Sequence, residues 1–229
     1  MDSDRRDVER RLRDELVEVG RCLRDRGLVV ATEGNLSVRL DQERVLATPA
    51  GADKGRLRAA DLVEVDLDGT VIGTGRASTE LGMHLAIYAA RGDLQAICHA
   101  HPPHATAFAV AHRALDVCVL PEVVCTLGAV PLSDYGTPST SEVGDAVRTV
   151  FADHDACLLR NHGAVTAAAT STAAMYVMET VERLAQVTWI AETLGGVRAL
   201  DREQVDRLLS IRGVYGSERP VPPCRACDD

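Results

Sequence analysis

Residues 95–103 read Gln-Ala-Ile-Cys-His-Ala-His-Pro-Pro, an apolar run that ends in two histidines and two prolines. The run predicts a buried strand over residues 95–100, and the prolines stop it because proline cannot donate to a hydrogen-bond ladder. Side chains two residues apart lie on the same face of a strand, so His99 and His101 point into one space. Two neutral imidazoles on one face suit a divalent metal, above all zinc. The alternative is that two histidines fall together on a polar surface.

A third histidine follows another predicted strand. Residues 156–159 are apolar, and Asn161-His162-Gly163 comes one residue later, with a glycine that allows the backbone to turn. In isolation, His162 is typical of a surface or hydrogen-bonded histidine. Together with His99 and His101, it completes the three ligands and one open position that catalytic zinc sites use.

The rest of the chain alternates between predicted helices and strands. We expect helices over residues 7–26, 78–90, 139–150, 171–195 and 201–212, and strands over 36–40, 45–48, 117–120, 129–132, 156–159 and 165–167, with a hairpin over 62–72. Ser139 and Glu142 form a capping box at the start of the third helix. Interleaved helices and strands favour an α/β domain with three α/β/α layers around a mixed or antiparallel sheet. We expect residues 1–219 to form this single domain and residues 220–229 to form a loose tail.

The composition excludes several classes of protein. The chain has 229 residues, 46% hydrophobic and 26% charged, which suits one ordinary domain and excludes a disordered or disulfide-stapled chain. A formal charge of −9 disfavours nucleic acid or an anionic membrane as a partner. No apolar run approaches the roughly 18 residues that a membrane helix needs, and residues 1–13 are too charged for a signal peptide. Seven cysteines, mostly in apolar segments, are interpreted as reduced thiols of a cytoplasmic protein.

Three further stretches offer groups that bind anions. Ser78-Thr79-Glu80 opens a predicted helix, where free N–H groups and two hydroxyls suit a phosphate, although helix capping alone explains this segment adequately. Glu80 would lie beside the metal if the strand of His99 packs alongside. The segments Gly34-Asn35-Leu36-Ser37 and Thr48-Pro49-Ala50-Gly51 are turns that offer backbone donors, and each alone is a turn and nothing more.

Two isolated features carry less information. Glu122 is an acid in an apolar neighbourhood, and such a residue is usually a surface residue. Cys224 and Cys227 have the spacing of metal ligands, but no second pair of this kind accompanies them, so we assign them no function.

Taken together, these motifs resemble the class II aldolase/adducin family. The matching pieces are, in chain order, residues 34–39, 48–51, 78–80 and 99–101, Tyr135 within a Tyr-Gly-Thr segment, and residues 161–163. They extend over most of residues 10–195 at the separations expected for the family. The joint match is therefore far more specific than any single piece.

The resemblance implies an α/β/α fold with a central, largely antiparallel sheet, and a homotetramer whose active sites lie between subunits. It implies metal ligation by His99, His101 and His162. For Glu80 it implies an acid/base role, with metal ligation in the resting enzyme as a further option. It also implies a set of phosphate-binding residues, namely Asn35, Gly51, Ser78 and Thr79, and two candidates for an additional acid/base, namely Glu122 and Tyr135. Two positions depart from the pattern of the aldolases, since Ala50 replaces a threonine and Leu120 lies near the place of a mobile catalytic tyrosine.

The function that the resemblance implies is that of a metal-dependent lyase. It would reversibly cleave a ketose 1-phosphate, of the fuculose-1-phosphate or 5-deoxyribulose-1-phosphate type, to dihydroxyacetone phosphate and an aldehyde. Such an enzyme stabilises an enediolate with a Schiff-base lysine or with a metal. Lys54 is the only lysine and lies in a polar stretch with no sign of an apolar pocket, which favours the metal. We expect zinc, with Mn²⁺ or Co²⁺ as alternatives.

Other functions on the same fold stay open. The nearest are a sugar-phosphate 4-epimerase, a dehydratase and a decarboxylase of phosphorylated oxo acids, all of which use the same metal site. A non-enzymatic, adducin-like interaction domain is a different class, against which the intact histidine triad argues. An iron-dependent oxygenase is a third class, which metal analysis would separate from an aldolase.

Overall fold

The computed structural model describes residues 2–216 and 220–226 and contains a seven-stranded sheet in the order β4-β3-β2-β1-β5-β7-β6. Every pair of neighbouring strands runs antiparallel. The strands are β1 (Asn35–Arg39), β2 (Arg44–Ala47), β3 (Val63–Asp66), β4 (Val71–Ile72), β5 (Ala96–Ala100), β6 (Ala156–Leu159) and β7 (Gly163–Ala168). The largely antiparallel sheet of the prediction is confirmed.

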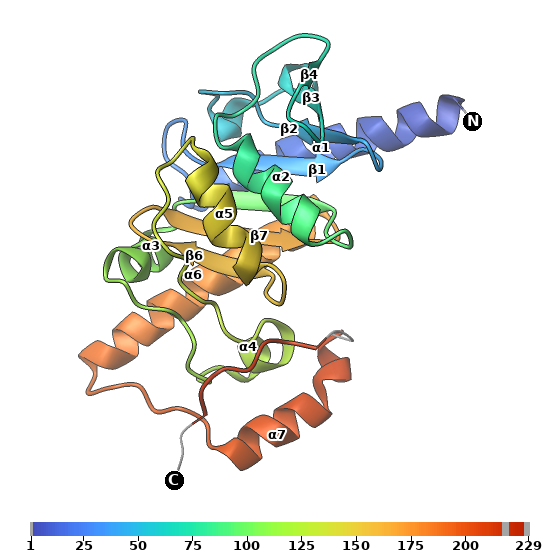
Figure 1. Cartoon of the computed structure of the whole chain (residues 1–229). Coiled ribbons are helices and arrows are strands. Elements are labelled where there is room, and N and C mark those ends of the chain that lie inside the picture. Colours follow the sequence, from blue (N-terminus) through green and yellow to red (C-terminus); the bar gives the residue numbers. More distant parts are fainter. Residues whose placement is uncertain (1, 217–219, 227–229) are drawn as a thin grey trace.

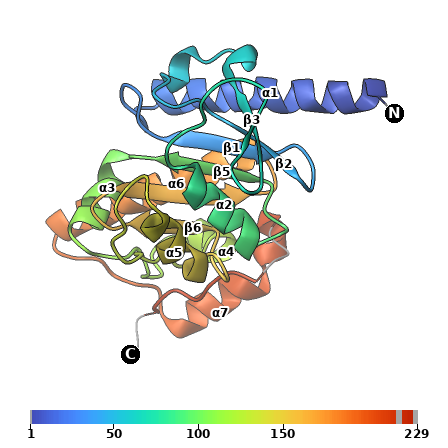
Figure 2. The same cartoon turned by 45° about the horizontal axis from the view of Figure 1, so that its top comes forward.

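Helices cover both faces of this sheet (Figure 1). In the described residues they are α1 (Asp2–Asp25), α2 (Leu81–Ala90), α3 (Pro103–Val110), α4 (Pro121–Thr126), α5 (Ser141–Val150), α6 (Ser171–Thr193) and α7 (Arg202–Ser210). Helices α2 and α5 lie together on one face, and α1 and α6 lie on the other (Figures 1 and 2). The three α/β/α layers are therefore confirmed.

Each face of the sheet has its own hydrophobic core, because successive side chains of a strand point to opposite faces. Leu36 and Cys98 pack on the side of α1 and α6, within one cluster of buried residues. Ile97 and Val165 pack on the side of α2 and α5, within a second cluster. His99 follows Ile97 by two residues, so its side chain lies on the side of α2 and α5.

Strand β1 is more deeply buried than a half-buried strand would be. Its first four residues are all buried, and this includes the polar residues Asn35 and Ser37. The strand lies between β2 and β5, with Asn35 directly opposite His99. Two polar side chains of β1 are thus brought under α2, next to the strand of the paired histidines.

Several predicted elements are confirmed and others are wrong. The hairpin at residues 62–72 forms, and β6 has the predicted bounds. The strands predicted at 117–120 and 129–132 do not form, since the described residues there contribute only isolated bridges. The same part of the chain holds α3 and α4, which were not predicted because each is short and begins with a proline. Proline is favoured at the first position of a helix, although in a sequence it is usually interpreted as the end of a helix or strand.

The start of α5 is shifted from the predicted capping box. Thr140 is the N-cap residue, and its hydroxyl accepts a hydrogen bond from the backbone N–H of Glu142. The carboxylate of Glu142 accepts a hydrogen bond from the N–H of Thr137 instead. The predicted cap, Ser139, has a φ of +66° and donates its hydroxyl hydrogen to Thr79.

The described part of the tail is attached to the domain, which differs from the loose segment expected from its composition. A disulfide joins Cys224 to Cys118, and the N–H of Cys118 donates to the carbonyl of Arg225. The carbonyl of Pro222 accepts a hydrogen bond from Ala129. The prediction that all cysteines are reduced is therefore wrong for this pair, whereas Cys22, Cys98, Cys125 and Cys157 are free. Cys227 lies outside the described residues.

Among the described residues, no helix combines the length and the apolar character required to cross a membrane.

Candidate metal centre and active site

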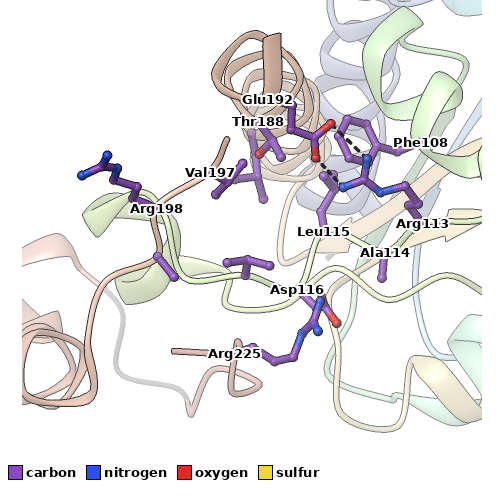
Figure 3. A pocket seen from close by; sticks show the side chains of 13 residues that line it. Phe108, Arg113, Ala114, Leu115, Asp116, Thr188, Glu192, Val197, Arg198 and Arg225 are labelled. Carbon is purple, nitrogen blue, oxygen red and sulfur yellow. Dashed lines mark hydrogen bonds and ion pairs between the residues drawn. The ribbon is translucent and has the colours of Figure 1, made fainter. Parts of the chain in front are cut away.

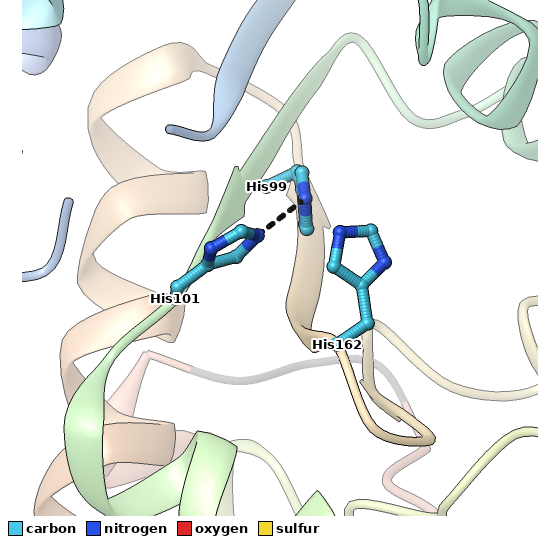
Figure 4. Close-up of side chains that lie close together, drawn as sticks. All are labelled: His99, His101 and His162. Carbon is cyan, nitrogen blue, oxygen red and sulfur yellow. Dashed lines mark hydrogen bonds between the residues drawn. The ribbon is translucent and has the colours of Figure 1, made fainter. Parts of the chain in front are cut away.

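The three histidines of the prediction converge at one end of β5 (Figure 4). His99 lies on β5, His101 follows the strand, and His162 lies in the turn from β6 to β7. Their ring centroids form a nearly equilateral triangle with sides of 4.7, 5.0 and 5.0 Å. One nitrogen of each ring lies within 4.8 Å of the others, and the Nε2 atoms of His99 and His101 are 3.2 Å apart.

Two glycines allow this convergence. A Cβ atom on Gly163 would lie 2.6 Å from the ring of His101, so only glycine lets His162 approach that side chain. Gly34 has a φ of +69°, and a Cβ atom there would lie 2.6 Å from the carbonyl of His99. The glycines of both motifs are therefore required by close packing at the histidines as well as by the turns.

Groups behind the rings orient two of the histidines. The Nδ1 atom of His99 lies 2.9 Å from the carbonyl of Ala164, so this nitrogen donates and Nε2 is left with a lone pair. The Nδ1 atom of His101 lies 3.5 Å from a carboxylate oxygen of Glu33. Outer partners of this kind fix the tautomer of a histidine that binds a metal. Glu33 was not predicted, because its position relative to His101 depends on the fold.

The donor set fits a divalent metal. Burial is the main cause that lowers the pKa of both His101 and His162 to about 4, so both rings are neutral at pH 7 and have a free lone pair. With metal–nitrogen bonds of about 2.0–2.1 Å, a tetrahedral zinc ion needs ligand atoms roughly 3.3 Å apart. The 3.2 Å separation between His99 and His101 is close to that value. The residues that could hold the metal are thus the three predicted ones.

Glu80 lies beside the three rings. One carboxylate oxygen, Oε1, is 3.2 Å from Nε2 of His162, and the other, Oε2, is 3.4 Å from Nε2 of His99. The side-chain amide of Asn35 donates a hydrogen bond of 2.8 Å to Oε2. Burial acts to raise the pKa of Glu80, but the neighbouring His99, His162 and Asn35 together lower it to about 2.

The local structure at Glu80 differs from the prediction. Helix α2 begins at Leu81, and Glu80 is its N-cap residue instead of a residue of the first turn. Its side chain makes no capping hydrogen bond. The carboxylate is therefore free of a helix-capping role and points toward the histidines.

The predicted phosphate-binding residues lie on three neighbouring segments. Asn35 contacts Glu80, and the hydroxyl of Ser78 accepts a hydrogen bond of 3.3 Å from the backbone N–H of Glu80. The segment of Gly51 pairs with that of Ser78, through a bridge between Pro49 and Ala77. Thr79 is exposed, and with Glu80 it lines a cavity of about 320 Å³ between the starts of α2 and α5.

Lys54 corrects one prediction. The sequence around it is polar, yet the side chain is only 2% exposed, and its ammonium donates to the carbonyls of Thr32 (2.7 Å) and Ala52 (2.6 Å). Burial lowers its pKa to about 8. These bonds tie the turn before Asn35 to the loop of Gly51. Because the ammonium is fixed between two carbonyls, Lys54 is suited to holding the loops rather than to forming a Schiff base.

The two additional acid/base candidates do not join the cluster within one chain. Tyr135 is 55% exposed, and no described hydrogen bond or ion pair links it to Glu80 or to the histidines. Glu122 lines a different cavity, between α4 and α6, together with Arg26 and Arg183.

A larger cavity, of about 610 Å³, lies away from the histidines, between the end of α6 and the attached tail (Figure 3). Its charged side chains are mostly paired with one another, as Arg113 is with Glu192 and Arg225 is with Asp116. It holds none of the predicted site residues.

Comparison with known proteins identifies the family of this arrangement. The family model of the class II aldolase and adducin N-terminal domain matches residues 14–189. An L-fuculose phosphate aldolase of Methanococcus maripaludis is 33% identical over 180 residues, which cover 79% of this chain and 97% of the relative. A 3-oxo-tetronate 4-phosphate decarboxylase of Pectobacterium atrosepticum is 34% identical over 187 residues, covering 80% and 85%.

Two further matches agree with these. A 5-deoxy-D-ribulose 1-phosphate aldolase of Bacillus thuringiensis serovar kurstaki is 30% identical over 209 residues, covering 90% of this chain and 97% of the relative. The solved structure of an L-fuculose 1-phosphate aldolase superposes with a TM-score of 0.81 at 29% identity, covering 87% of this chain and 94% of that one.

Proposed function

The chain belongs to the class II aldolase and adducin family, and from that premise we propose that it is a metal-dependent aldolase. It would reversibly cleave a ketose 1-phosphate, of the fuculose-1-phosphate or 5-deoxyribulose-1-phosphate type, to dihydroxyacetone phosphate and an aldehyde. The names of the relatives support this substrate class, since two of the three are aldolases of such sugar phosphates.

One observation carries the proposal, namely the position of Glu80 beside the histidine triad. Its two carboxylate oxygens lie 3.2 and 3.4 Å from ring nitrogens of His162 and His99. A base at this distance reaches a carbon atom of a substrate that is held at the same histidines. General base catalysis requires such reach first and a suitable pKa second.

The residues of the chain divide the work of the reaction. In the direction of synthesis, the Glu80 carboxylate takes a proton from C3 of dihydroxyacetone phosphate, and C3 then forms a bond to the carbonyl carbon of the aldehyde. The aldehyde oxygen takes up a proton from a second acid, and cleavage reverses both transfers. His99, His101 and His162 would hold the metal, which as a Lewis acid would stabilise negative charge on the oxygen atoms of the substrate.

The phosphate would bind at the segments of Asn35, Gly51, Ser78 and Thr79. Their support is positional, because Ser78 and Asn35 both contact Glu80 and the segment of Gly51 is bridged to that of Ser78. Backbone N–H groups and hydroxyls suit an anion in a chain with a single lysine. Ala50 removes one hydroxyl that the aldolase pattern has, and this bears on which sugar is used.

We propose zinc as the metal, because imidazole ligands suit it, and a homotetramer with active sites between subunits. The support for the tetramer is that Glu122 and Tyr135 do not reach Glu80 in one chain, so the second acid would come from a neighbouring subunit. A cytoplasmic location completes the proposal, since phosphorylated substrates do not cross membranes unaided.

A second candidate is the decarboxylation of a phosphorylated 3-oxo acid. The relative of 34% identity with that printed activity favours it. Loss of carbon dioxide also leaves an enediolate, but it needs no base to remove a carbon-bound proton. The aldolase reaction would therefore require Glu80 as a base, whereas the decarboxylation would not.

The experiment is to load the purified chain with zinc and incubate it with dihydroxyacetone phosphate and a panel of short aldehydes. Mass spectrometry would detect a ketose 1-phosphate if the chain is an aldolase. A parallel incubation with a 3-oxo-tetronate 4-phosphate would be monitored for carbon dioxide. Release of carbon dioxide without formation of any ketose phosphate would replace the aldolase by the decarboxylase, and the absence of both products would refute both proposals.

A further inference from the structure

A chain of buried polar side chains runs behind Glu80, between β1 and α2. It consists of Asn35 and Ser37 on β1 and of His84 and Tyr88 on α2, which are only 0–3% exposed. Asn35 contacts Glu80 at 2.8 Å and His84 at 2.6 Å. Ser37 contacts His84 at 2.7 Å and Tyr88 at 2.9 Å. None of these contacts involves a histidine of the triad.

Between Glu80 and Ser37, the hydrogens of this chain can point in one direction only. Oε2 of Glu80 accepts the hydrogen bond from Asn35, so the amide of Asn35 turns its NH₂ group toward Glu80 and its oxygen toward His84. That oxygen also only accepts, so Nε2 of His84 carries the ring hydrogen. Nδ1 then accepts a hydrogen bond from Ser37. The hydroxyl of Tyr88 lies 2.9 Å from the oxygen of Ser37 and 3.3 Å from the carbonyl of Gln95, and its one hydrogen can go to either.

The environment of His84 supports this assignment. Burial lowers the pKa of His84 to about 3, so the ring is neutral and carries a single hydrogen. Each of its nitrogens has one partner, and the two partners demand opposite roles. A reversed amide would place two oxygen atoms face to face, Oδ1 of Asn35 against Oε2 of Glu80.

We propose that His84 and Ser37 are positioning residues that hold the Asn35 amide as a donor to Oε2 of Glu80. This inference rests on the proposed function, in which Glu80 moves a carbon-bound proton. Because Oε2 is fixed as an acceptor, the transferred proton is carried by Oε1, the oxygen that faces His162. The chain thereby selects which oxygen of the base reacts and in which direction it points.

The first test reads the ring hydrogen directly and needs no activity. ¹⁵N NMR of histidine-labelled protein distinguishes the two neutral tautomers, and the His84→Gln variant assigns the signal. We expect a neutral ring with its hydrogen on Nε2, unchanged from about pH 5 to 9, because its pKa lies far below this interval. A hydrogen on Nδ1 would overturn the proposal, since the Asn35 oxygen would then face Glu80.

The second test compares variants of the loaded enzyme. His84→Phe fills the volume of the ring without its nitrogens, and we expect a loss of kcat of about 10-fold or more, because small misplacements of a catalytic group are costly. KM and metal content should change less than about 3-fold. Ser37→Ala, which removes only the donor to Nδ1, should give a smaller loss of the same kind. It also serves as the second variant if His84→Phe does not fold.

A matched control removes a buried hydroxyl outside the chain. Thr166 is fully buried on β7 and donates to the carbonyl of Ala174 at 2.7 Å, so Thr166→Val should retain kcat. Wild-type kcat in both His84→Phe and Ser37→Ala would refute the positioning role. If the wild type forms no ketose phosphate, the proposed function fails, while the NMR test still decides the direction of the hydrogen bonds.

Discussion

Oε1 of Glu80 lies 3.2 Å from Nε2 of His162, so the candidate base and a candidate metal ligand face each other across the site. The Nε2 atom of His162 can give a lone pair to a metal or a hydrogen to the carboxylate, but this one atom cannot do both. Metal binding through Nε2 would therefore release Oε1 from this partner while Asn35 still holds Oε2. The predictions below follow from this competition and from the groups that surround it.

The histidine triad predicts one divalent metal per chain that is retained to unusually low pH. The pKa of His101 and of His162 is lowered to about 4 by burial, so at these two ligands protons compete with the metal only as the pH approaches that value. Elemental analysis after dialysis between pH 8 and 4 should show retention at pH 5.5 and loss toward pH 4. His101→Ala should lose the metal even at pH 8, whereas His154→Ala, outside the cluster, should keep it. Full metal content in His101→Ala would remove this residue from the ligand set.

The proposed phosphate site predicts that substitutions at Ser78 and Thr79 weaken the binding of phosphorylated substrates only. Exchanging both Ser78 and Thr79 for alanine removes two hydroxyls next to Glu80. Because a hydrogen bond to a charged phosphate contributes more than a neutral one, its loss should raise KM at least about 10-fold. Metal content should not change, because neither residue contacts the triad. Thr193→Ala, on the exposed end of α6, is the control. Equal cleavage of phosphorylated and unphosphorylated ketoses by the wild type would show that the site is misassigned.

Because the ammonium of Lys54 is buried, we expect the free energy of unfolding to rise at alkaline pH. Its pKa is lowered by burial from 10.5 to about 8 in the folded chain, so between these values the unfolded chain binds more protons and the free energy of unfolding rises with pH. The contribution is about 3 kcal/mol over the whole interval. Denaturant titrations of Lys54→Met should lack this rise, whereas Arg56→Met, at an exposed neighbour, should keep it. Equal pH dependence in Lys54→Met and the wild type would refute burial of the charge.

Because of the disulfide, we expect the thermal stability of the chain to depend on redox conditions. The bond between Cys118 and Cys224 closes a loop across 106 positions, and its removal should cost about 2–4 kcal/mol. Cys118→Ser should therefore lower Tm, and added reductant should lower the Tm of the wild type but not that of the variant. Cys22→Ser, at a free and partly buried thiol, should leave Tm unchanged. Absence of the cross-linked peptide from non-reducing digests would contradict the pairing.

Local signals in the sequence predicted the parts of the site that depend on strand geometry. His99 and His101 are two residues apart on one strand, so their common face follows from the alternation of side chains. The contacts of Asn35 with Glu80 and His84 join residues 45 and 49 positions apart, and only the packing of α2 on β1 creates them. One available signal was given no role, namely that His84 follows Glu80 by four residues, one helical turn, at the start of a helix.

Most of the wrong predictions from the sequence concern polar residues that the fold buries. Lys54 stands in a polar stretch, and nothing local indicates that two carbonyls from separate loops enclose its ammonium. The attachment of the tail likewise depends on a partner far away in the sequence, Cys118. Helices α3 and α4 were missed because proline opens a helix as readily as it ends one.

We expect the Glu80 carboxylate to stay ionised at every pH at which activity can be measured. In the metal-free chain its pKa is lowered to about 2 by His99, His162 and Asn35, in spite of burial, and the charge of a bound metal would also favour the carboxylate. Acidification should therefore stop the reaction through loss of the metal and not through protonation of the base. Glu80→Gln preserves the shape but cannot take up a carbon-bound proton, and kcat should fall by roughly 10²–10⁴-fold. Exchange of solvent deuterium into dihydroxyacetone phosphate isolates this step from the formation of the carbon–carbon bond. The exposed Glu203→Gln should exchange at the wild-type rate. If Glu80→Gln also does so with its metal in place, another residue is the base, and Glu122 of a neighbouring subunit becomes the next candidate to exchange.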